Sequence, residues 1–208
     1  MNLALFDFDG TITTRDTFLE FIRFALAPSR LLVGKALLTP WILGYRLGLI
    51  SAPRIRPVIS RVAFSGMREQ ALRSLGEAFA KEQLPLWIRR ETRQRLDWHR
   101  EQGDQIVVVS ASLDVYLSAW CREQGFDVLC TNLEAKGGRI TGRYRDGDCS
   151  GSVKKGRVLS KYDLTRYGTV FAYGDTIEDR ELLELAERRF FRGREIAHTS
   201  EMNPAISW

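Results

Sequence analysis

The chain has 208 residues, of which 44% are hydrophobic and 27% are charged. This length and composition fit a soluble globular protein of one domain, with or without a large insertion, and exclude a disordered, fibrous or repeat protein. The formal net charge of +5 suits an anionic partner, but the densest basic stretch, 89–100, alternates with acids in a helical pattern typical of a solvated helix face. We therefore expect no nucleic-acid partner.

The N-terminal residues predict the first strand and the cellular location. Leu3 to Phe8 is a short apolar run closed by Asp9-Gly10, which is typical of a buried strand and its exit turn. This start lacks the basic residues and the long apolar segment of a signal peptide. The three cysteines are widely spaced and indicate neither a disulfide framework nor a zinc site. We expect a cytoplasmic protein, with membrane-peripheral attachment as the alternative.

The segment 15–83 has helical periodicity and no convincing strand. It is too long for a loop in a compact domain, because structureless loops beyond about 15 residues are uncommon. We therefore expect an all-helical cap over 15–83, inserted into a core made of residues 1–14 and 84–208.

The most apolar part of this insertion is 31–50. Lys35, Pro40 and Arg46 interrupt it, so a membrane-spanning helix is not expected. Two interpretations stay open. The segment forms a pair of buried cap helices broken near Pro40, or it forms a hydrophobic hairpin that rests on a membrane surface with Trp41 at the interface.

After the insertion, strands and helices alternate, which predicts an α/β fold of the Rossmann type, a parallel sheet with helices on both faces. The expected strands are Gln105–Ser110, Asp127–Cys130, Thr169–Tyr173 and Arg189–Arg192. The expected helices are Leu84–Glu101, Leu113–Gln124 with Ser112 as its cap, and Ile177–Arg188. The stretch Glu134–Tyr144 has a Gly-Gly turn between short polar strands and predicts a surface hairpin.

Polar residues suited to phosphoryl chemistry lie at or near the ends of these predicted strands. They are Asp7, Asp9, Ser110, Lys154, Asp175 and Asp179. Because the carboxyl ends of adjacent parallel strands share one edge of the sheet, we expect their side chains to converge there. Carboxylates, a hydroxyl and an ammonium group together form a coherent site for a phosphoryl group and a hard cation.

The order and spacing of these residues resemble the haloacid dehalogenase superfamily of phosphatases over nearly the whole chain. Asp7-Phe-Asp-Gly-Thr11 is similar to its first motif, Ser110 to the second, Lys154 to the third, and Gly174-Asp175 with Asp179 to the fourth. The stretches 109–113, 131–134, 140–142 and 149–154 further resemble the phosphoserine-phosphatase-like branch, which carries a helical cap between the first two motifs.

This resemblance implies a role for each acid. Asp7 is then the nucleophile that becomes an aspartyl phosphate, and Asp9 the general acid and base, a role worth about 10²–10⁴-fold in rate. The implied cofactor is Mg²⁺, held by Asp7, the backbone carbonyl of Asp9 and Asp175. Asp179 is implied as a direct ligand or as a residue just behind the ligands.

The resemblance also implies substrate contacts. Ser110 and the backbone at Ala111 would bind phosphoryl oxygens, and Thr11 and Asp16 complete the expected substrate-binding set. Asp16 stands where phosphoserine phosphatases have a glutamate, and capping of a helix that begins at Thr17 explains it equally well. These enzymes also have a serine where this chain has Gly10. Lys155 stays open as an alternative to Lys154.

The leading hypothesis is a Mg²⁺-dependent phosphomonoester hydrolase acting on a small phosphorylated metabolite. An alternative substrate is a phosphorylated lipid headgroup such as phosphatidylglycerophosphate, with membrane contact through 31–50. A phospho-accepting receiver and a binding domain without turnover are the other classes considered. Asp9 and the large insertion argue for turnover, since receivers have neither feature. The sequence predicts no particular oligomeric state.

Overall fold

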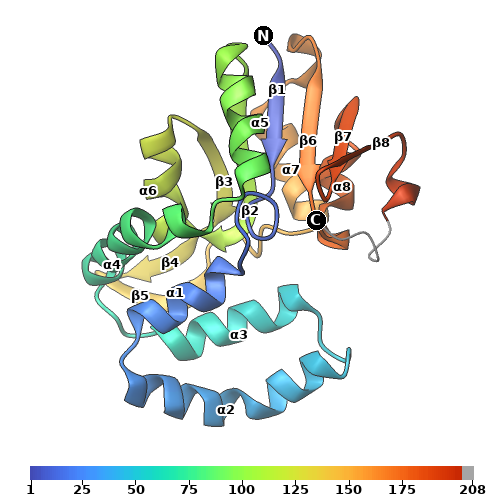
Figure 1. Ribbon diagram of the computed structural model, residues 1–208. Coiled ribbons are helices and arrows are strands. Elements are labelled where there is room, and N and C mark those ends of the chain that lie inside the picture. Colours follow the sequence, from blue (N-terminus) through green and yellow to red (C-terminus); the bar gives the residue numbers. More distant parts are fainter. Residues whose placement is uncertain (203–208) are drawn as a thin grey trace.

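A six-stranded sheet with the strand order β3-β2-β1-β6-β7-β8 forms the centre of the computed structural model, which describes residues 1–202 (Figure 1). The strands are β1 (Leu3–Phe6), β2 (Gln105–Leu113), β3 (Asp127–Thr131), β6 (Val170–Gly174), β7 (Arg188–Phe191) and β8 (Arg194–Ile196). All neighbouring pairs are parallel except β7 and β8. The predicted parallel sheet is confirmed, and the antiparallel edge strand β8 is an addition to it.

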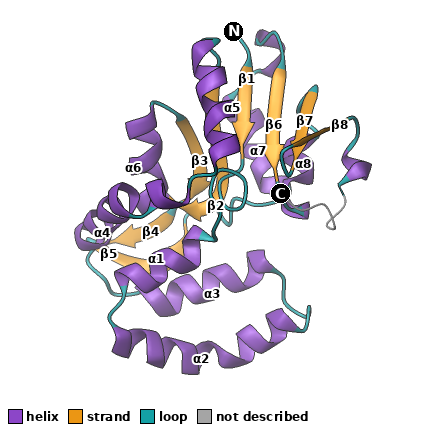
Figure 2. Cartoon of the chain, in the orientation of Figure 1, coloured by secondary structure: helices purple, strands orange, loops and turns teal. Residues whose placement is uncertain are grey.

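Helices cover both faces of this sheet (Figure 2). Helices α5 (Arg90–Glu101) and α6 (Asp114–Gln124) pack on one face, and α7 (Ser152–Lys161) and α8 (Arg180–Leu183) pack on the other. Along β1, Ala4 and Phe6 belong to the first core, whereas Leu3 and Leu5 belong to the second. Because β1 is buried on both faces, its sequence is an unbroken apolar run rather than an alternating one.

The predicted helical insertion forms four helices. They are α1 (Thr17–Ala25), α2 (Pro28–Arg46), α3 (Ala52–Phe64) and α4 (Glu69–Glu82). The predicted break near Pro40 is wrong, because α2 runs through Pro40 and ends at Arg46. A proline inside a helix removes one backbone hydrogen bond but need not end the helix. No helix within residues 1–202 is long and apolar enough to cross a membrane.

The predicted hairpin, β4 (Leu133–Lys136) and β5 (Arg139–Tyr144), packs against α3 rather than lying free on the surface. Ile140 is buried, and its backbone exchanges hydrogen bonds with the segment that follows α3: Gly66 N–H donates to Ile140 O over 2.9 Å, and Ile140 N–H donates to Met67 O over 2.9 Å. The hairpin therefore supports the cap.

Two predicted helices are shorter than expected. The stretch from Leu84 divides into the 3-10 helix η1 (Leu84–Trp87) and α5, because Ile88 pairs with Thr13 in an isolated bridge. The helix expected over Ile177–Arg188 divides into the 3-10 helix η3 (Ile177–Asp179) and α8, because the chain must turn back into β7. The remaining short helices are η2 (Leu164–Arg166) and η4 (Thr199–Glu201).

Candidate active site

Three acidic side chains meet at the carboxyl edge of the central strands. Asp7 directly follows β1 and Asp175 directly follows β6, while Asp179 ends η3. The backbone N–H of Asp7 donates to Tyr173 O over 2.9 Å, which holds the ends of β1 and β6 together. One carboxylate oxygen from each of Asp7, Asp175 and Asp179 lies within 4.8 Å of the other two. The predicted convergence of these acids is confirmed.

Lys154, in the first turn of α7, places its ammonium group among these acids. Its Nζ donates to Asp7 Oδ1 and, over 2.6 Å, to Asp179 Oδ1. Lys154 is only 2% exposed, and burial alone would lower its pKa, but Asp179 and Asp7 outweigh that effect and raise it. Lys155 instead pairs with Glu184 at the surface over 3.3 Å. Of the two lysines, Lys154 therefore enters the site.

Asp179 also holds the loop that carries Asp175. Its Oδ2 accepts hydrogen bonds from the backbone N–H groups of Asp175 and Thr176, over 3.1 and 3.0 Å, and from the Thr176 hydroxyl. Both Asp179 oxygens are thus engaged by protein donors. This arrangement favours Asp179 as an orienting residue behind the metal ligands rather than as a ligand itself.

Gly10 and Thr11 fix the other side of Asp175. Thr11 Oγ1 donates to Asp175 Oδ1 over 3.2 Å. Gly10 has φ +82°, and a Cβ atom placed there would lie 2.2 Å from Asp175 Oδ2. Only glycine combines this backbone conformation with so close an approach. A serine at this position, as in phosphoserine phosphatases, would require Asp175 to move.

The local electrostatics fit a divalent cation. Burial, together with repulsion from Asp179, raises the pKa of Asp7 well above its ordinary value and that of Asp175 to about 7. Within residues 1–202, hydrogen bonds engage only Oδ1 of each of these two acids, so each has an oxygen left for a ligand. Clustered carboxylate oxygens are the donors that Mg²⁺ prefers, and the residues present fit that ion.

The Asp9 side chain is held separately by donors from the cap and from β2. Asp9 Oδ1 accepts from Thr17 N–H over 2.9 Å and from Thr17 Oγ1 over 2.5 Å, and Asp9 Oδ2 accepts from Ser112 Oγ over 2.7 Å. Burial and the nearby Asp16 raise the pKa of Asp9 to about 6, although the Thr17 and Ser112 hydrogen bonds oppose that shift. A carboxyl group with this pKa can both release and accept a proton near neutral pH.

The sequence did not point to the residues that orient Asp9. Ser112 was expected to cap a helix, but that is wrong, because β2 continues to Leu113 and α6 begins without a side-chain cap. Thr17 and Ser112 also bond to each other over 3.1 Å, and Thr17 bonds to the Tyr116 hydroxyl over 3.1 Å. No local pattern could reveal this network, because Thr17 and Ser112 are 95 residues apart.

The remaining predicted substrate-binding residues lie around this centre. Ser110 is 1% exposed, and its hydroxyl accepts the Ser112 N–H over 3.1 Å. Ala111 follows it in β2. Asp16 caps α1 by accepting the Leu19 N–H over 3.1 Å, which confirms the capping interpretation. Contacts of Thr11, Asp16, Ser110 and Ala111 with a substrate stay predictions.

Arg56, on α3, joins the cap to the core beside these acids, and no local sequence pattern indicates this role. Its guanidinium group donates to Asp148 Oδ1 over 3.1 Å and to Glu178 Oε2 over 3.0 Å. Burial opposes the charge of Arg56, but Asp148 and Glu178 outweigh it and raise the pKa of Arg56. Since Glu178 precedes Asp179, this bridge ties the cap directly to the acidic loop.

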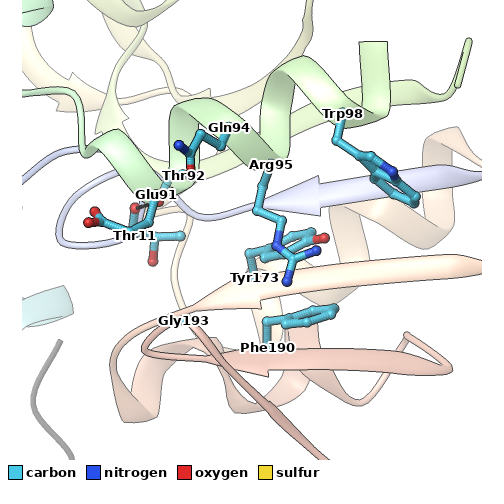
Figure 3. A pocket seen from close by; sticks show the side chains of 9 residues that line it. All are labelled: Thr11, Glu91, Thr92, Gln94, Arg95, Trp98, Tyr173, Phe190 and Gly193. Atoms are coloured by element: carbon cyan, nitrogen blue, oxygen red, sulfur yellow. Dashed lines mark hydrogen bonds between the residues drawn. The ribbon is translucent and has the colours of Figure 1, made fainter. Parts of the chain in front are cut away.

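A cavity of about 420 Å³ lies next to the carboxylates, between α5 and strands β6 and β7 (Figure 3). It is lined by Thr11, Glu91, Thr92, Gln94, Arg95, Trp98, Tyr173, Phe190 and Gly193. Arg95 stacks over the Phe190 ring at 5.2 Å within it. The clustered acids do not line this cavity. We place the candidate active site at the acids, because they and Lys154 are the groups suited to phosphoryl chemistry.

The chain is similar to known proteins over most of its length. The family model of the haloacid dehalogenase-like hydrolases matches residues 4–184. Protein CicA of Caulobacter vibrioides is 31% identical over 201 residues, which cover 92% of this chain and 87% of that protein.

Solved structures share the fold. A protein with unknown function from Bordetella pertussis Tohama I gives a TM-score of 0.71 at 20% identity, covering 90% of this chain and 88% of its own. A probable phosphoserine phosphatase from Vibrio cholerae gives 0.66 at 16% identity, covering 91% and 56% respectively.

Proposed function

This chain belongs to the haloacid dehalogenase-like hydrolase family, and we propose that it is a Mg²⁺-dependent phosphomonoester hydrolase that works through an aspartyl phosphate on Asp7. The observation that carries the proposal is the Asp7 carboxylate, which is buried against Lys154 and lies within 4.8 Å of Asp175 and Asp179. The predicted motifs, with Asp7 and Asp175 directly after strands, Ser110 near the end of β2 and Lys154 in the first turn of α7, also support it.

In the first half-reaction, a carboxylate oxygen of Asp7 attacks phosphorus and the phosphorus–oxygen ester bond breaks. The departing alcohol takes its proton from Asp9, whose carboxyl group Thr17 and Ser112 hold in place. In the second half-reaction, water gives a proton to Asp9 and attacks the aspartyl phosphate. Inorganic phosphate leaves, and Asp7 is regenerated.

Positive charge is needed because an anion attacks an anion. Lys154 supplies one positive charge directly on Asp7. Mg²⁺, when bound by Asp7, Asp175 and the Asp9 carbonyl, supplies further charge stabilisation to the phosphoryl group. Ser110 and the backbone at Ala111 contribute hydrogen-bond donors near the carboxyl end of β2, and Asp179 keeps Lys154 and the Asp175 loop in position.

The proposed substrate is a small phosphorylated metabolite. Phosphoserine itself is disfavoured, because Asp16 is engaged as a helix cap and Gly10 replaces the serine of phosphoserine phosphatases. A phosphorylated lipid headgroup is a second candidate, favoured by the exposed apolar surface of α2. A receiver domain, in which Asp7 would be phosphorylated but not hydrolysed, is less well supported. Thr17 and Ser112 hold Asp9 two residues after the nucleophile, where it can act as the acid and base of hydrolysis.

Phosphate release from an aryl phosphate tests the mechanism. We expect activity with Mg²⁺, none in excess chelator, and none in the Asp7→Asn variant. Asp97→Asn, an exposed acid on α5, is the matched control and should retain full activity. Asp9→Asn should slow both half-reactions by about 10²–10⁴-fold while Mg²⁺ binding persists. Full activity in chelator or in Asp7→Asn would refute the mechanism, and a screen of phosphorylated metabolites and phospholipids would identify the substrate.

A further inference from the structure

Helix α2 and the turn after it expose an unusual concentration of large apolar side chains. Eight of them have exposed fractions between 43% and 74%: Leu32, Val33, Leu37, Trp41, Leu43, Tyr45, Leu47 and Leu49. Leu38 is the buried residue of the helix. Soluble surfaces carry scattered apolar side chains, but a contiguous apolar surface of this kind marks an interaction site.

Because α2 packs against α3, this apolar surface faces away from the rest of the protein. Within the described residues, α2 packs against α3 through the narrow face that contains Leu31, Gly34 and Leu38. Figures 1 and 2 show α2 at the outer edge of the cap, with α3 between it and the hairpin and sheet. A helix that is apolar all round is normally buried in protein or in lipid. Here the described residues cover chiefly the side of α2 that faces α3.

The segment that carries this surface has charged side chains of one sign only. Residues 21–68 contain no aspartate or glutamate and eight basic residues: Arg23, Arg30, Lys35, Arg46, Arg54, Arg56, Arg61 and Arg68. All of these except Arg56 are exposed. Since the whole chain has a net charge of +5 and this segment contributes +8, the other residues together carry −3. The net positive charge is therefore concentrated in the part of the cap that carries the apolar surface.

We propose that α2 and the turn 47–51 dock the protein on an anionic lipid surface. Apolar side chains enter the boundary between headgroups and acyl chains, while Lys35 and Arg46 reach the anionic headgroups. Trp41 and Tyr45 are suited to the membrane interface, where an amphipathic ring contacts both phases.

An anionic bilayer fits better than a second copy of the chain. Pairing two α2 surfaces would bring two caps of equal positive charge together without any acid from 21–68 to offset them. This docking does not depend on the proposed hydrolysis, since it concerns α2 and not the carboxylate site. For the second substrate candidate, a phosphorylated lipid headgroup, docking would also bring the substrate to the cap.

Flotation of the full chain with vesicles tests the docking. We expect binding to vesicles of phosphatidylcholine with phosphatidylglycerol and at least tenfold weaker binding to phosphatidylcholine alone. Leu37→Glu and Trp41→Glu should each reduce binding at least tenfold. Lys35→Gln should reduce it about fivefold, which corresponds to about 1 kcal/mol per basic residue near an anionic surface. Leu86→Glu, at an equally exposed leucine outside the cap, is the control and should bind as wild type does.

Two further measurements separate the outcomes. Quenching of tryptophan fluorescence by brominated lipid should fall in Trp41→Phe, which locates α2 at the bilayer. Aryl phosphatase activity in solution should be unchanged in Leu37→Glu, which shows that the variant is folded. No vesicle binding by wild type, or equal losses in Leu37→Glu and Leu86→Glu, would overturn the proposal. A wild-type dimer that Trp41→Glu dissociates, without vesicle binding, would overturn it in favour of self-association.

Discussion

Replacing Lys154 by methionine would leave the Asp7 and Asp179 carboxylates without the ammonium group that both now bind. Lys154 is 2% exposed, so water does not replace that group. Removing one partner of a buried ion pair costs about 3–5 kcal/mol. For a chain of this size, each kcal/mol lowers the melting temperature by about 2–4 °C. We expect Lys154→Met to melt about 6–20 °C below wild type in buffer with chelator.

Lys155→Met is the matched control for this experiment. Lys155 and its partner Glu184 have 39% and 40% of their side chains exposed, and such pairs contribute about 0–1 kcal/mol. Urea unfolding measured by circular dichroism would compare the free energies of unfolding of the two variants. Lys154→Met should also lower kcat at least about 100-fold, because the charge beside the nucleophile is lost. A larger loss in Lys155→Met, or wild-type stability in Lys154→Met, would contradict this electrostatic description.

Three further predictions concern neighbouring features. Gly10→Ala should raise the Mg²⁺ concentration for half-maximal activity at least about tenfold, because the new Cβ atom would displace Asp175. Backbone strain should also lower the free energy of unfolding in urea by about 1–3 kcal/mol. An unchanged Mg²⁺ dependence would contradict this. Arg56→Gln should lower the free energy of unfolding, measured in urea, by about 1–3 kcal/mol, since it breaks the ion pairs of Arg56 with Asp148 and Glu178, and Arg56→Lys should restore part of the loss. Burial lowers the pKa of His99 despite its hydrogen bond to Asp104, so the unfolded chain binds a proton there more readily than the folded chain does. The stability that His99 contributes is therefore full above pH 6.5 and is lost as the pH falls towards the lowered pKa. His99→Gln should flatten that part of the wild-type stability profile, and an unchanged profile would contradict it.

The sequence was sufficient to predict the fold class and the meeting of Asp7 with Asp175. Strand and helix patterns are local, and the alternation of the two implies a parallel sheet whose carboxyl ends share one edge. Asp7 and Asp175 could therefore be brought together from the sequence, because each directly follows a strand of that sheet. Helix ends were less predictable. The bridge between Thr13 and Ile88 separates η1 from α5, and the return of the chain into β7 ends α8.

Only the tertiary structure decided which side chains serve these acids. Thr17 and Ser112 meet at Asp9 because α1 packs beside the end of β2, a contact between residues 95 apart that no local pattern encodes. Lys154, not Lys155, enters the site because it shares the inner face of α7 with buried Val158. The exposure of α2 was equally undetermined, because an apolar segment has the same sequence in a core and on a surface. What separates those two cases is how much of the segment the fold covers, and among the described elements α2 packs chiefly against α3.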